Sequence, residues 1–449
     1  MAISIQLGAI LATLLVINIY FMSVKKYELI FSICIILLTF VSKEENGIIS
    51  GVPYDTGGVI NLSIVGYDVL IILILSLALR HGKIKSLGAF WRRAVIYTWL
   101  TITIRFVIDG FGVLSNKVFD NYLLPMAYVL LMIRYLDKEK AIKVVKVLYV
   151  CVLINAAVGS CEYFLGRSLL FHEYYMKAVG WYPNTYLAQQ YGVSFRCTAF
   201  LGHPLTNGMY YLMGMVYLFN NEKKWNWFKI AQFAVLGFAI FATNSRGALL
   251  ILSIYILFYL ISNKKALKLC FLAGMGVVIT TGINLQEIYN NIFARDATGS
   301  SMMVRVKVLL NFFDIPIQNV VMGMGYNNVG TIFSKYTGGA NAEISYIILL
   351  MENGIAGFIS WFVALASIYN NKMCRMFNGI KYSGLIHGML ICFLMYAATS
   401  NSFADPGTLT YLLCFILALS RIGKVDTFKE NSIYGNGMES KEANSRLPV

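Results

Sequence analysis

The chain has 449 residues, of which 58% are hydrophobic and 13% are charged. Soluble domains are usually about 45 to 50% apolar and about 25% charged, so this composition excludes a soluble globular enzyme. The formal net charge of +15 does not indicate nucleic-acid binding, because the basic residues separate apolar blocks. Helices that are apolar on every side belong in lipid. The composition therefore predicts an all-α, polytopic integral membrane protein.

Thirteen apolar stretches are predicted to span the membrane, with about 17 to 25 residues taken as the length of one span. In chain order they lie near 4–22, 27–42, 59–79, 94–113, 119–134, 141–164, 204–220, 227–244, 246–262, 267–285, 344–368, 383–402 and 406–420. The segment after Met1 lacks a basic region and a small-residue cleavage site, so no signal peptide is expected.

The basic residues predict the orientation, because loops on the cytoplasmic side retain Lys and Arg. Of the 37 basic residues, 26 fall in alternate loops and in the tail. This places the N-terminus outside and the C-terminus in the cytoplasm. The expected parts are N-terminal helices (1–165), an outer loop (166–203), central helices (204–285), a large outer loop (286–343), C-terminal helices (344–420) and a disordered cytoplasmic tail (421–449).

The two outer loops are long, and long connections in a compact bundle are usually functional. Within the larger loop, residues 301–313 carry apolar side chains at helical spacing, which predicts a helix lying in the membrane interface. The eight cysteines mostly lie inside apolar stretches and show no CxxC or Cys/His spacing. The cysteines therefore indicate core packing and no metal site.

Five candidate functional residues share the outer face. Arg196 and His203 precede the span at 204–220, and Arg246 lies in the outer turn that opens the span at 246–262. Arg305 is on the interfacial segment, and Glu343 precedes the span at 344–368. Guanidinium groups suit diphosphate oxygens, because they stay charged and donate in a planar fork. Each arginine alone is as well explained as an anchor to lipid headgroups. A lone His before Pro is more often structural than a proton carrier.

Two features within the spans have structural interpretations. Glu352 lies nine residues beyond Glu343 on one predicted helix, roughly 13 Å deeper at about 1.5 Å per residue, and is expected to support the bundle or its cavity. Arg105 and Asp109 are four residues apart on one helix and are expected to neutralise each other.

Aromatic residues on the outer loops are candidates for stacking on sugar rings: Trp181, Tyr182 and Tyr326, with Tyr174 and Tyr175 nearby. An interfacial aromatic belt is an equally good explanation for those in the first loop.

Residues 195–357 resemble the O-antigen polymerase and O-antigen ligase superfamily (Wzy and WaaL type). The motifs occur in the family's order: Arg196 before a Gly and a Pro, SRG at 245–247 opening a span, an Arg-bearing segment leading to GxG at 323–325, and a final motif at 342–357. That last motif resembles A-H-N-x-Y-x(5)-E-x-G-I-x-G, with Glu343 and Ile344 in place of the His-Asn pair.

The resemblance implies a GT-C-like helical bundle that transfers a glycan from an undecaprenyl-diphosphate donor on the outer leaflet, without nucleotide sugar, metal or other cofactor. Ligases typically depend on the missing His, so a polymerase is favoured. In this interpretation Arg196, Arg246 and Arg305 bind the diphosphate, and Glu343 is the general base with His203 in reserve.

Two alternatives remain open. A ligase would deliver finished glycan to another acceptor, and a flippase would move the lipid-linked repeat across the bilayer. The expected partners are the lipid-linked oligosaccharide, the bilayer of the bacterial inner or plasma membrane, and flippase and chain-length regulator proteins, with no nucleic acid.

Overall fold

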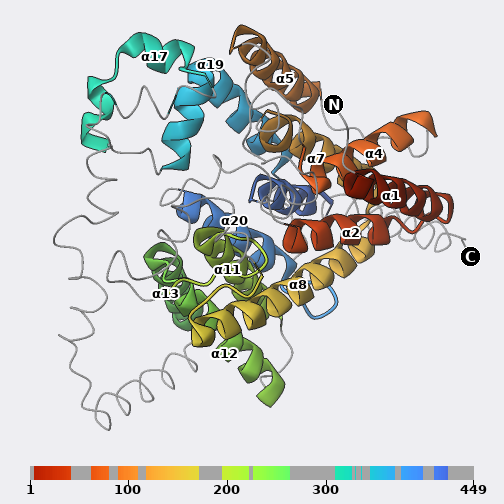
Figure 1. The fold of residues 1–449 in the computed structure, drawn as a ribbon, viewed down its shortest axis with the longest axis vertical. Helices are drawn as coiled ribbons and strands as arrows, with labels where there is room; N and C mark the ends of the chain where they lie inside the picture. The colour runs from red at the N-terminus through yellow and green to blue at the C-terminus, as the bar shows by residue number, and fades with distance from the viewer. Residues whose placement is uncertain are drawn as a thin grey trace, which may run out of the picture.

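The computed structural model describes residues 5–41, 62–79, 89–109, 118–170, 195–221, 226–262, 309–325, 329, 335, 344–369, 376–397 and 409–422. Regular structure in these ranges is helical (Figure 1). The strand-like contacts found there are isolated bridges of Ile380 with Asn221 and Phe377.

The helices mostly coincide with the predicted spans. They are α1 (Ile5–Ser23), α2 (Tyr27–Phe40), α4 (Ile64–Ala78), α5 (Ala89–Asp109), the π-helix η1 (Phe119–Leu123), α7 (Leu124–Tyr135), α8 (Lys138–Leu165), α11 (Pro204–Asn220), α12 (Trp227–Ala242), α13 (Arg246–Ser262), the 3-10 helix η4 (Phe312–Asp314), α17 (Ile317–Met322), α19 (Ser345–Ile368) and α20 (Tyr382–Ala397). The exceptions are η4 and α17, which lie in the predicted outer loop at 286–343. A further apolar helix covers Leu409–Ile422. The span predicted at 267–285 lies outside the described residues.

Within the described ranges, three helices, α1, α8 and α19, are long and apolar enough to cross a membrane by themselves, and six shorter helices are also apolar. Many large hydrophobic side chains on these helices face outward, including Val16, Val150 and Ile359. A water-soluble protein does not expose apolar surface on this scale. The structure therefore confirms the prediction of an all-α, multi-pass membrane protein, while the orientation of its termini stays a prediction.

Helix α11 is the centre of the lower half of the molecule in Figure 1, where α8, α12, α13 and α20 pack around it. Nearly every residue of α11 is buried. Two glycines permit this packing. A Cβ at Gly214 would lie 2.7 Å from Val152 of α8, and one at Gly208 would lie 3.2 Å from Ala248 of α13. As the sequence predicts, α11 begins at Pro204, whose missing N–H costs nothing in the first turn of a helix.

Candidate functional site

Residues 195–203, here called the pre-α11 segment, carry Arg196 and His203. The segment packs against the C-terminal end of α8 and against the turn between α12 and α13. Its backbone meets α12 where the Cys197 N–H donates to the carbonyl oxygen of Ala242 at 3.1 Å. Contacts with α8, with α12 and with the turn at Thr243 thus position a stretch that has no regular structure of its own.

Glu162, near the end of α8, holds the pre-α11 segment. Its side chain is fully buried. Atom Oε2 accepts hydrogen bonds from the backbone N–H groups of Thr198 at 2.8 Å and Ala199 at 2.7 Å. Atom Oε1 accepts from the N–H of Leu169 at 2.8 Å and from the hydroxyl of Ser168 at 3.1 Å. Hydrogen bonds to a charged group are the strong ones, so this single carboxylate fixes the loop backbone.

Arg196 and Arg246 come from different parts of the chain and meet at one turn. The Nε of Arg196 donates to the carbonyl oxygen of Thr243 at 3.0 Å. Arg246 is the first residue of α13, three positions after Thr243, and its side chain is exposed. Two guanidinium groups and the N-terminal dipole of α13 therefore lie at the same end of the bundle, which favours an anion there.

The turn that carries Arg246 has a defined geometry. Asn244 adopts a left-handed backbone with φ of 50°, a conformation that Asn tolerates better than most residues. Ser245 is buried, and its hydroxyl accepts the N–H of Ala248 at 3.3 Å, which caps α13. The same hydroxyl lies 3.3 Å from the hydroxyl of Tyr396 in α20. The start of α13 is thus tied to a neighbouring helix.

His203 occupies the N-cap position of α11 and is half-buried. Its carbonyl oxygen accepts both the backbone N–H and the side-chain amide of Asn207, each at 3.1 Å. Asn207 in turn accepts from Asn155 at 2.6 Å, and Asn155 accepts the N–H of Phe200 at 3.0 Å. His203 therefore has a backbone role in a polar network at the same end of the bundle as Arg196. A catalytic role for its imidazole stays a prediction.

Cys197 directly follows Arg196 in the chain and is fully buried. Burial raises the pKa of the Cys197 thiol well above its usual value, the Glu162 carboxylate raises it further, and Arg196 lowers it. The thiol therefore stays protonated near neutral pH and is a poor nucleophile.

Five predicted site residues lie outside the described residues: Arg305, Glu343, Trp181, Tyr182 and Tyr326. The side chains of Arg105 and Asp109 are likewise outside the described part of α5. The predicted interfacial segment 301–313 is described from residue 309, where a helical turn leads into η4 and α17.

The GxG motif docks onto a kink in α19. Gly354, inside that helix, has φ of 67° and ψ of 179°, which interrupts the helical backbone. A Cβ at Gly323 would lie 2.6 Å from the Gly354 nitrogen, and the Met324 N–H donates to the carbonyl oxygen of Met351 at 2.6 Å. The GxG backbone therefore packs directly against the α19 backbone at Gly354. This contact is a structural explanation for the GxG motif.

Glu352 is buried just before this kink, as its predicted depth requires. The hydroxyl of Tyr122, in the π-helix η1, donates to Oε2 of Glu352 at 3.0 Å. The amide of Asn353 donates to the same hydroxyl at 3.0 Å. Glu352 thus joins α19 to η1 within the bundle, which agrees with the supporting role expected for it.

Glu162 is the residue that sequence reasoning missed. It lies within the predicted span at 141–164, with no Lys or Arg within four residues on either side. An isolated acid near the end of an apolar stretch needs hydrogen-bond donors from elsewhere in the fold. That isolation was the available signal.

The family comparison covers the larger, C-terminal part of residues 195–357. Residues 231–362 match the family model described as O-antigen ligase. The comparison with curated proteins finds no match. The matched range is less than a third of the chain and holds the SRG, GxG and final motifs, while Arg196, His203 and Glu162 precede it. This match confirms the resemblance to the O-antigen polymerase and ligase superfamily for residues 231–362.

Proposed function

We propose that the protein is a membrane glycosyltransferase that polymerises a bacterial surface polysaccharide, such as O-antigen, capsule or exopolysaccharide. The donor is a glycan on undecaprenyl diphosphate, and the acceptor is a sugar hydroxyl of another lipid-linked repeat unit. The observation that carries the proposal is the approach of Arg196 and Arg246 to one turn, because a diphosphate leaving group needs two or more fixed cations.

The proposed reaction is a displacement at the anomeric carbon of the donor sugar. The acceptor oxygen forms a bond to this carbon while the bond to the diphosphate oxygen breaks. Arg196, Arg246 and Arg305 offset the charge that develops on the departing undecaprenyl diphosphate. Glu343 takes the proton from the acceptor hydroxyl, with His203 as the second candidate for this step. We place this site on the outer face of the inner or plasma membrane, with the C-terminus in the cytoplasm.

A ligase is the second candidate function, and the description of the matching family favours it. A ligase uses the same donor and the same arginines but delivers finished glycan to another lipid, wall polymer or protein. The replacement of the family's His-Asn pair by Glu343 and Ile344 supports the polymerase.

The lipid-linked glycans of a deletion strain separate these candidates. A polymerase predicts single repeat units on the carrier in the outer leaflet, and a ligase predicts long chains that stay on the carrier. Single units confined to the inner leaflet would contradict both and indicate a flippase. Complementation with Arg246→Ala is expected to reproduce the deletion profile. The matched control is Arg167→Ala, an exposed arginine just after α8, which is expected to restore wild-type chains.

A further inference from the structure

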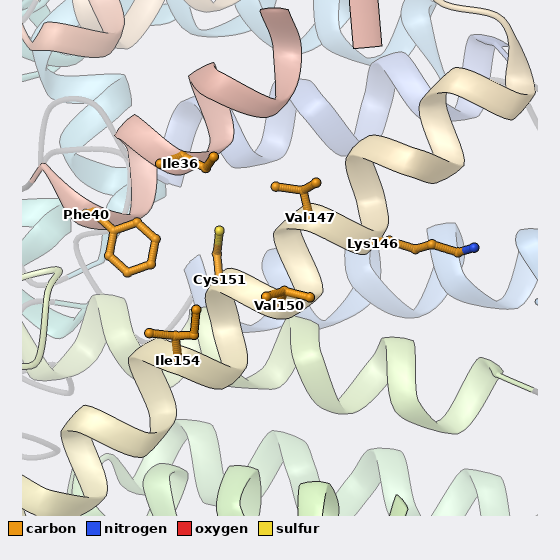
Figure 2. Close-up of a pocket in the computed structure, with 7 residues that line it drawn as sticks. All are labelled: Ile36, Phe40, Lys146, Val147, Val150, Cys151 and Ile154. Atoms are coloured by element: carbon orange, nitrogen blue, oxygen red, sulfur yellow. The ribbon is translucent and has the colours of Figure 1, made fainter. Parts of the chain in front are cut away.

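A membrane-facing groove runs between α2 and α8, apart from the candidate site. It has a volume of about 360 Å³ and is lined by Ile36, Phe40, Lys146, Val147, Val150, Cys151 and Ile154. Figure 2 shows Ile36 and Phe40 on α2 facing the α8 side chains across it, with Lys146 at one end and Ile154 near the other. All lining residues except Lys146 are apolar or thiol-bearing, so the groove suits hydrocarbon.

Lys146 stands where α8 enters the apolar part of the bilayer. The fifteen residues from Val147 to Cys161 contain no charged side chain. From Lys146 to Ile154 the helix rises about 12 Å at about 1.5 Å per residue, close to half of a hydrocarbon core about 30 Å thick. The groove therefore has the length of a lipid chain from one leaflet, with a cation at the headgroup end.

Lys146 differs from the other lysines at this end of α8. Lys138 lies over the ring of Phe377, Lys140 pairs with Asp137, and Lys143 pairs with Glu28. Lys146 is exposed and has no acidic or aromatic partner in the described part of the chain. Its ammonium group is thus available to a phosphate at the headgroup level.

We propose that this groove binds an anionic phospholipid, with one acyl chain between α2 and α8 and the phosphate held by Lys146. The far end of the groove is bounded by Phe40, whose ring packs edge-on against Phe200 of the pre-α11 segment at 4.7 Å between centroids. The acyl chain therefore ends next to an aromatic contact that supports the segment carrying Arg196.

The test uses the full-length protein in detergent, titrated with phosphatidylglycerol or with phosphatidylcholine of the same chain length, and native mass spectrometry to count bound lipid. The wild type is expected to prefer phosphatidylglycerol. Lys146→Gln should weaken phosphatidylglycerol binding about fivefold, from about 1 kcal/mol per lysine near anionic lipid. Lys140→Gln changes the net charge equally and should leave binding unchanged.

A second pair of variants tests the acyl chain. Val150→Trp fills the groove from an exposed position and should reduce the binding of both lipids, whereas Ala157→Trp, at an exposed site on α8 outside the lining, should not. Two results would each overturn the proposal: equal losses of phosphatidylglycerol binding in the two lysine variants, or wild-type binding by Val150→Trp.

Discussion

Replacing Glu162 by Gln tests whether one buried carboxylate holds the pre-α11 segment in place. The amide has nearly the same shape but carries no charge and has only one acceptor oxygen. In its better orientation this oxygen faces the N–H groups of Thr198 and Ala199, which the carboxylate now binds at 2.8 and 2.7 Å. A hydrogen bond to a charged group contributes about 1.5 to 3 kcal/mol, against about 0.5 to 1.5 kcal/mol for a neutral one. These two weakened bonds cost about 2 kcal/mol of local stability. This figure is a minimum, because the amide nitrogen that replaces Oε1 cannot accept the N–H of Leu169.

Alkylation of Cys197 by N-ethylmaleimide, followed by peptide mass spectrometry, measures this loss. Cys197 has 0% exposure, so the reagent reaches it only when the segment opens. When opening and closing are faster than alkylation, the rate follows the open population. A cost of about 2 kcal/mol predicts labelling about 30-fold faster in Glu162→Gln. The exposed Cys161 serves as the internal reference.

The matched control is Glu139→Gln, which removes an exposed acid from the first turn of α8 at its other end. Its Cys197 labelling should equal that of the wild type. If Glu162→Gln labels Cys197 within twofold of the wild-type rate while Cys161 labels normally, other contacts hold the segment and the Glu162 carboxylate does not.

Two further predictions concern the kink in α19. Gly354→Ala should lower the thermal unfolding midpoint clearly, because the backbone conformation of Gly354 is nearly exclusive to Gly and a Cβ would lie 2.5 Å from a carbonyl oxygen of α17. The control Gly8→Ala should not lower the midpoint, because a Cβ at Gly8 would have nothing within 4 Å. Equal midpoints in the two variants would show that the kink is not needed. Tyr122→Phe should cost about 1 to 3 kcal/mol by removing the donor to Glu352. The buried hydroxyl of Tyr128 has no hydrogen-bond partner among the residues that the structure describes, so Tyr128→Phe should be neutral in the same assay. Equal losses in the two variants would show that the hydrogen bond from Tyr122 to Glu352 contributes nothing.

The sequence predicted the helices well, because apolar length and turn chemistry determine them locally. Pro204 marked the start of α11 correctly, and the spans at 227–244 and 246–262 agree closely with α12 and α13. The span at 59–79 was predicted to begin too early. Its helix α4 begins at Ile64, because Ser63 caps it and is itself bound by Asp120 through its N–H at 2.7 Å and its hydroxyl at 2.9 Å. Asp120 is distant in sequence, so no local pattern revealed this cap.

The site was predictable only in part. The distribution of Lys and Arg among the predicted loops indicated that Arg196 and Arg246 lie on the same side of the membrane. The structure brings both residues to the turn at Thr243. Glu162 was missed because its partners are mainly backbone N–H groups of loops. Almost every residue type has such a group, so the sequence does not reveal these partners. The kink at Gly354 was missed because the apolar run of α19 continues through it, and its cause is the backbone of another segment.

Glycan transfer by the purified protein shows directly whether Arg196 and Arg246 stabilise the departing diphosphate. The protein in nanodiscs receives a synthetic repeat unit on undecaprenyl diphosphate, and both elongated glycan and released undecaprenyl diphosphate are measured. We expect one diphosphate to be released for each unit added. The transfer rate should fall at least a hundredfold in Arg196→Ala/Arg246→Ala, because the two arginines stabilise the leaving group by about 3 kcal/mol or more. Arg167→Ala should transfer at the wild-type rate. Undiminished transfer by the double variant, with correct folding, would contradict this role of the two arginines.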